Sequence, residues 1–103
     1  MSVQYQIKVG KDGANVQANY DLSVPVGGNE LIADFQLNVE GENLIKNVTP
    51  GQTRFNGTAF HVLAKPDQDA PVSFSISTDQ GWTKSGSDTL RGSRRYDDVS
   101  FQG

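Results

Sequence analysis

Apolar and polar side chains alternate one by one along the first forty residues, and the polar half of the pattern is mostly carboxamide. The first run has its apolar residues at odd positions, namely Val3, Tyr5, Ile7 and Val9. Similar runs cover 16–24 and 31–39. Because successive side chains of a strand point to opposite faces, the pattern predicts a sheet with one apolar face and one amide-rich face.

Turn signals separate these runs from further short strands. Asp12-Gly13 is a strong hairpin signal, and Pro50-Gly51 predicts a second turn. Strands are predicted at about 3–9, 15–24, 31–39, 44–48, 53–64 and 72–77, with a closing strand around 99–101. No window has a helical period. The sequence therefore predicts an all-β, single-domain antiparallel β-sandwich, immunoglobulin-like or jelly-roll-like, with about seven to eight strands.

The alternation stops between about 79 and 98. Gly, Ser, Thr, Asp and Arg dominate this stretch, whose large apolar residues are Trp82 and Leu90. We predict that residues 1–103 form one domain containing an irregular polar segment at about 79–98.

Charge and composition exclude several classes of partner. The net charge is −3 and the isoelectric point about 4.9, so the chain as a whole has no basic surface for nucleic acid or an anionic membrane. We expect no nucleic-acid partner and no membrane insertion. The chain has no cysteine, hence no disulfide. It has no signal peptide or apolar transmembrane run, and this leaves its compartment unknown.

The inventory of reactive side chains argues against catalysis. His61 is the only histidine, and its apolar surroundings predict a packed or interface residue on a central strand. The carboxylate pairs Asp67/Asp69 and Asp97/Asp98 are typical of turns and caps rather than of a catalytic dyad or a calcium loop. We therefore expect no enzyme activity, no catalytic residues, no metal site and no cofactor.

The densest cluster of binding-prone residues lies where the alternation stops. Arginine and tyrosine are common at binding hot spots, and an exposed tryptophan can stack on a sugar ring or a protein surface. Trp82 fits either partial exposure or a plug in the core, and the arginines fit either a ligand site or local ion pairs. The candidate ligand-binding residues are Trp82, Arg91, Arg94, Arg95, Tyr96, Asp97 and Asp98.

Two functions follow from these residue types. The favoured hypothesis is a lectin-like, carbohydrate-binding module with a loop site in the C-terminal segment. The alternative is a structural or assembly module that forms homo-oligomers or contacts another protein. The amide face of the first three runs has no outward aromatic residue, which predicts a neutral wall or a flat interface rather than a binding surface.

Overall fold

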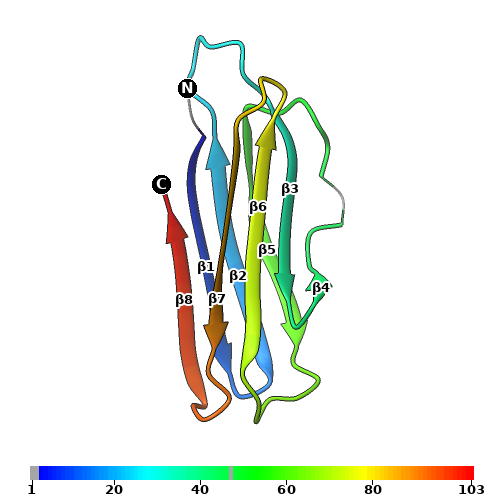
Figure 1. The fold of residues 1–103 in the computed structure, drawn as a ribbon, viewed down its shortest axis with the longest axis vertical. Coiled ribbons are helices and arrows are strands. Elements are labelled where there is room, and N and C mark those ends of the chain that lie inside the picture. Colours follow the sequence, from blue (N-terminus) through cyan, green and yellow to red (C-terminus); the bar gives the residue numbers. More distant parts are fainter. Residues whose placement is uncertain (1–2, 47) are drawn as a thin grey trace.

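The computed structural model describes residues 3–46 and 48–103. These residues form eight strands and two antiparallel sheets packed face to face (Figure 1), which confirms the predicted all-β sandwich. In chain order the strands are β1 (Gln4–Asp12), β2 (Asn15–Ser23), β3 (Ile32–Val39), β4 (Glu42–Asn43), β5 (Arg54–Val62), β6 (Ala70–Thr78), β7 (Thr83–Leu90) and β8 (Tyr96–Gln102).

The two sheets have the strand orders β5-β2-β1-β8 and β4-β3-β6-β7. The molecule is elongated, with extents of 45 × 23 × 18 Å. In the view of Figure 1, the β2–β3 loop and the β6–β7 turn lie at the upper end of the sandwich. The β1–β2 and β7–β8 turns lie at the lower end. Each end therefore has its own set of loops.

The core is formed by the apolar side chains of the alternating sequence pattern. In β1 the burial pattern alternates strictly over the first six residues, and β6 buries every second side chain. Tyr5 is buried and Tyr20 packs against the core, as their parity predicts. The largest fully buried side chains are Phe35, Ile7, Leu22, Ile32, Leu37, Ile76 and Leu90, with Val3, Val9, Val39 and Val72.

Two clusters of aromatic rings fill the space between the sheets. Phe35 meets Tyr20 and Phe55 at centroid distances of 5.4 and 6.1 Å. Phe74 contacts Tyr5 at 5.5 Å and Phe101 at 4.7 Å. Tilted and edge arrangements of this kind favour aromatic pairs beyond the area they bury.

The prediction of an irregular segment over 79–98 is wrong for residues 83–90 and for 96–98, which begin β8. Residues 83–90 form β7, which pairs with β6 from Ala70↔Leu90 to Ser77↔Thr83. Most β7 side chains are exposed or half-buried, because this is an edge strand. Its backbone hydrogen bonds to β6 define it, and its Ser, Thr and Gly side chains do not alternate enough to reveal it in the sequence.

The short strand predicted near 44–48 is also misplaced. β4 is Glu42–Asn43, paired with Asn38 and Val39 across a two-residue turn at Glu40 and Gly41. Position 47 lies outside the described residues. The run predicted at 53–64 is a single strand, β5, with regular pairing to β2 through Asn56 and Gly57.

Truncating the central aromatic ring tests this account of the core. Phe35→Ala removes a fully buried side chain that contacts two other rings, and we expect the free energy of unfolding to fall by about 3–5 kcal/mol. The control is Gln36→Ala, on the exposed face of the same strand, which should change it by less than about 0.5 kcal/mol. Equal effects in urea denaturation would contradict the proposed packing.

Candidate functional site

The outer face of the β5-β2-β1-β8 sheet carries the polar half of the alternation. We call it the amide face. Its outward residues are Gln4, Gln6, Lys8, Gly10 and Asp12 of β1; Asn15, Gln17, Asn19, Asp21 and Ser23 of β2; Arg54, Asn56, Thr58, Phe60 and Val62 of β5; and Tyr96, Asp98, Ser100 and Gln102 of β8.

Strand register places these residues in rows across the sheet. One row is Tyr96, Asp12, Asn15 and Val62. The next row is Asp98, Gly10, Gln17 and Phe60. Each row crosses three gaps between strands, roughly 14 Å at about 4.8 Å per gap.

These two rows line a shallow depression of about 840 Å³. Its rim is apolar: Phe60 and Val62 stand on the β5 side and Tyr96 on the β8 side, exposed by 73%, 68% and 64%. Single exposed apolar residues are common, but Phe60 and Val62 are neighbours on one face of β5, and adjacent exposed apolar side chains mark interaction surfaces. Amides and carboxylates lie between the two sides of the rim.

Gly10 forms the floor of the depression. A Cβ at this position would meet its nearest described neighbours, both in β8, at 3.9 Å, which is ordinary van der Waals contact. The pairing of β1 with β2 and β8 is regular through Gly10. Neither packing nor strand geometry therefore requires a glycine here.

The other strand glycines of the sandwich differ in this respect. A Cβ at Gly57 would approach the Tyr20 hydroxyl to 2.7 Å, and one at Gly86 would approach the Phe74 ring to 2.8 Å. Each glycine is the direct cross-strand partner of that aromatic residue. Close packing against aromatic rings of the core accounts for Gly57 and Gly86. It does not account for Gly10, which lies on the outer face.

Arg95 holds Tyr96 at its place on the rim. The Arg95 guanidinium lies 5.1 Å from the Tyr96 ring centroid, and its Nε is 3.1 Å from Asp12 Oδ1. The Gly13 N–H donates to the Arg95 carbonyl at 2.7 Å, so the β7–β8 turn is fastened to the β1–β2 turn. Tyr96 is thus presented beside Asp12 by contacts from two hairpins.

The remaining candidate residues of the β7–β8 turn have structural contacts. The Arg91 N–H donates to Asp97 Oδ2 at 2.8 Å, and this bond is the main reason that the pKa of Asp97 is held below its ordinary value. Arg94 lies 3.7 Å from the other Asp97 oxygen. The Gly92 N–H donates to Asp69 Oδ1 at 2.9 Å. Asp97 and Asp69 therefore stabilise the turn, whereas Asp98 lies on the amide face.

Trp82 lies at the other end of the sandwich from this turn. It precedes β7 and Arg91 follows it, so the eight-residue strand separates the two by roughly 30 Å at about 3.3 Å per residue. Trp82 is half-buried and packs against the core. The seven candidate residues therefore do not form one site. Tyr96 and Asp98 lie on the amide face, Arg95 supports Tyr96 from the adjoining turn, and Trp82 lies at the other end of the sandwich.

The outward residues of β1, β2 and β3 include no aromatic, as the sequence predicts. The three strands do not share one face, however, because β3 lies in the other sheet. β5 and β8 flank β2 and β1 instead, and they add Phe60 and Tyr96 to the amide face. The sequence signal for Phe60 was present in the 59–64 run, which is apolar on both parities. An apolar residue at an outward position, on a strand with one face in solvent, would have identified Phe60 as a surface residue.

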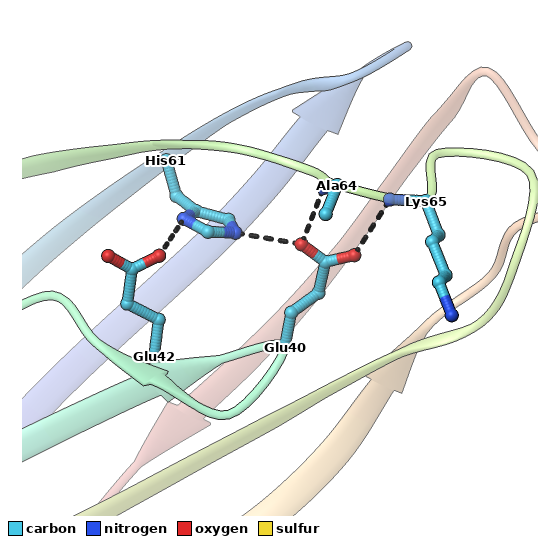
Figure 2. Close-up of polar contacts among 5 residues, drawn as sticks. All are labelled: Glu40, Glu42, His61, Ala64 and Lys65. Carbon is cyan, nitrogen blue, oxygen red and sulfur yellow. Dashed lines mark hydrogen bonds and ion pairs between the residues drawn. The ribbon is translucent and has the colours of Figure 1, made fainter.

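His61 ties the two sheets together at one edge, as Figure 2 shows. It lies on β5, which is an edge strand and not the central strand predicted. Its Nε2 is 2.9 Å from Glu40 Oε1, and its Nδ1 is 3.3 Å from Glu42 Oε2. An imidazolium can donate from both nitrogens, whereas a neutral ring donates from one.

Glu40 is the centre of this contact. Besides His61, its carboxylate accepts the N–H groups of Ala64 at 2.8 Å and Lys65 at 3.1 Å. Glu40 has a φ of 54°, a backbone region that glycine and asparagine favour. The hydrogen bond from His61, then those from the two N–H groups, lower the pKa of Glu40, while partial burial acts in the opposite direction.

Other arrangements of titratable groups offer little chemistry. In 3–46 and 48–103, no group of three or more His, Asp or Glu side chains is placed to hold a metal ion. No helix in the described part of the chain is long and apolar enough to cross a membrane. The amide-face depression is thus the strongest candidate ligand site.

Comparisons with known protein families, curated proteins and solved structures give no match.

Glu40→Gln tests the contact between the sheets through its pH dependence. The folded-state pKa of Glu40 lies below its ordinary value of 4.5, so its stabilisation is complete above that value and is lost as the pH falls through the folded-state pKa. The variant should be less stable than the wild type by roughly 1–3 kcal/mol at neutral pH. The difference should shrink as the pH falls below 4.5, the ordinary value for this carboxyl.

Glu42→Gln is the matched control, because its carboxylate is more exposed and its distance to His61 is longer. We expect a smaller effect at neutral pH. Urea denaturation at several pH values measures both variants. A stability difference for Glu40→Gln that does not change between neutral and acid pH would contradict the assignment.

Proposed function

We propose that the protein is a non-enzymatic carbohydrate-binding module and that the depression on the amide face is its binding site. This differs from the site expected from the sequence, since the turn residues act mainly as its support. Tyr96 and Asp98 are common to both. We propose no catalytic role because the chain has one histidine and no cysteine, and the His61 side chain is only 9% exposed.

The chemistry of the depression supports a sugar ligand. Sugar rings combine apolar C–H faces with hydroxyl groups that both donate and accept hydrogen bonds. Tyr96 and Phe60 offer exposed ring surfaces, and Asn15 and Gln17 each offer an acceptor oxygen and a donor NH₂ group. Asp12 contributes a carboxylate between them. A few placed polar groups beside apolar surface are typical of small-ligand sites.

Gly10 is the observation that carries the proposal. A glycine within a strand is destabilising by roughly 0.5–1 kcal/mol relative to alanine. Within strands, glycine marks a bulge, a bend or a place where a ligand or another backbone approaches closely. The pairing of Gly10 is regular and the space for a Cβ is open, so close approach of a ligand is the remaining reason.

The spacing of the apolar groups favours an oligosaccharide over a single sugar. Tyr96 and Val62 are separated by the full width of the sheet, and Phe60 lies one row further along. A chain lying across the strands would contact both sides of the rim while its hydroxyl groups face the amides. The volume of about 840 Å³ is within the range of small-molecule sites, about 300–1,000 Å³.

Assembly through the β5 edge is the second candidate. β5 leaves one side of its nine-residue backbone unpaired in its sheet, and its outward Phe60 and Val62 are exposed. Edges of this kind can pair with another chain. Carbohydrate is favoured because an amide surface with an open glycine floor is a poor match for the apolar centre of a protein interface.

Gly10→Leu separates binding from folding. The new side chain would fill the floor of the depression without a steric conflict at Cβ, and the loss of glycine should leave stability equal or raised by up to about 1 kcal/mol. We expect binding on a glycan array to be lost. Thermal unfolding monitored by circular dichroism measures the stability.

Gln6→Leu is the matched control, since it adds the same side chain to the same face of β1 outside the depression. It should leave glycan binding intact.

Tyr96→Ala should weaken binding by roughly tenfold or more, as removal of an aromatic contact does at binding hot spots. Absence of binding by the wild type across the array, or retained binding by Gly10→Leu, would overturn the proposal. A wild type that binds no glycan and sediments as an oligomer would support assembly instead.

A further inference from the structure

A buried carboxylate lies in the β2–β3 loop at the upper end of the sandwich, away from the depression on the amide face. Glu30 is 4% exposed. Its Oε2 accepts a hydrogen bond from the Thr78 hydroxyl at 2.7 Å. Its Oε1 is buried and has no hydrogen-bond partner among residues 3–46 and 48–103. A buried carboxylate with an unpaired oxygen is costly, and in native structures such a group calls for an explanation.

Glu30 forms part of the lining of a second depression, of about 640 Å³. The rest of the lining comes from Gly28, Asn29, Gln80, Gly81 and Trp82. Trp82 belongs to the β6–β7 turn, where its backbone N–H donates to the Thr78 hydroxyl at 3.3 Å and its carbonyl accepts from the Thr78 N–H at 3.0 Å. Thr78 therefore contacts both the Trp82 backbone and the Glu30 carboxylate.

The charge of this depression has one sign. Glu30 is the only charged residue among the described residues that line it. Asp79, next to Thr78, adds a second carboxylate at the same turn, where its Oδ1 accepts the Leu31 N–H at 2.9 Å. A negative charge that no cationic side chain of the lining compensates attracts a cation, and the face of a tryptophan attracts cations also.

We propose that this depression is a binding site for an organic ammonium group. The ammonium would compensate the Glu30 carboxylate, and its alkyl carbons would lie against the Trp82 indole. A small protonated amine and a methylated ammonium both combine a cationic nitrogen with alkyl carbons. The proposed ligand class includes both. The site uses different residues from the amide face, so each proposal can fail without the other.

Trp82 is the only tryptophan of the chain, so its fluorescence reports directly on this site. The probes are n-butylammonium, tetramethylammonium and the uncharged n-butanol, at constant ionic strength. We expect a saturable change in fluorescence with at least one of the two cations and none with butanol. The stronger of the two cations indicates whether the site prefers a primary or a methylated nitrogen.

Two substitutions test the role of charge. Glu30→Gln removes the carboxylate charge and should weaken cation binding by about tenfold or more. Asn29→Lys places an ammonium on an exposed lining residue and should weaken it similarly, through repulsion or by occupying the site. The matched control is Val26→Lys, which adds the same charge to an exposed residue of the same loop outside the lining and should leave binding within about twofold.

Circular dichroism establishes that each variant is folded. If Glu30→Gln fails to fold, the Asn29→Lys and Val26→Lys pair decides the question. An equal response to butanol and butylammonium would overturn the proposal, because it would mean an apolar pocket. So would the absence of a saturable response in the wild type, unchanged binding in a folded Glu30→Gln variant, or equal binding by the two lysine variants.

Discussion

The structure depends on burying the alternate side chains of two sheets against each other. A shift of one residue in any strand would move its apolar side chains to the solvent and its polar ones into the core. Burial of residues such as Ile7, Leu22 and Val99 therefore fixes the pairing of β1 with β2 and β8. That pairing also determines which outward residues become neighbours. The rows that join Tyr96 to Asp12 and Gly10 to Gln17 are a consequence of how the inner face packs.

The two ends of the sandwich carry different chemistry on the same frame. At the lower end, the β1–β2 and β7–β8 turns are fastened by backbone hydrogen bonds and by Asp97, which leaves Tyr96 exposed beside Asp12. At the upper end, Thr78 joins the Glu30 carboxylate to the turn that carries Trp82. Also toward the lower end, at the opposite edge from β8, Glu40 and His61 connect the edges of the two sheets. Polar side chains thus position loops that the apolar core does not reach.

The alternation in the sequence predicts the fold class and most strands because burial acts directly on local pattern. It does not predict β7, whose Ser, Thr and Gly residues are ordered by hydrogen bonds to β6 rather than by burial. Nor does it predict strand order, which depends on contacts far apart in the sequence. For that reason Phe60 could not be placed on the same face as Tyr96. Because β7 was not predicted, Trp82 could not be separated from Arg91. The arginines were identified as a cluster, but their contacts to Asp97 and Asp12 emerge only from the folded turn.

The central claim is that the regular amide face, and not the loop beside it, is the binding surface. Amide NMR spectra of isotope-labelled protein, recorded during titration with oligosaccharides that bind on an array, test it most directly. We expect the largest shifts at Gly10, Gln17, Phe60 and Tyr96, which come together only across β5, β2, β1 and β8. Shifts concentrated instead at 91–94, or spread along the β7 edge without Gly10, would contradict it.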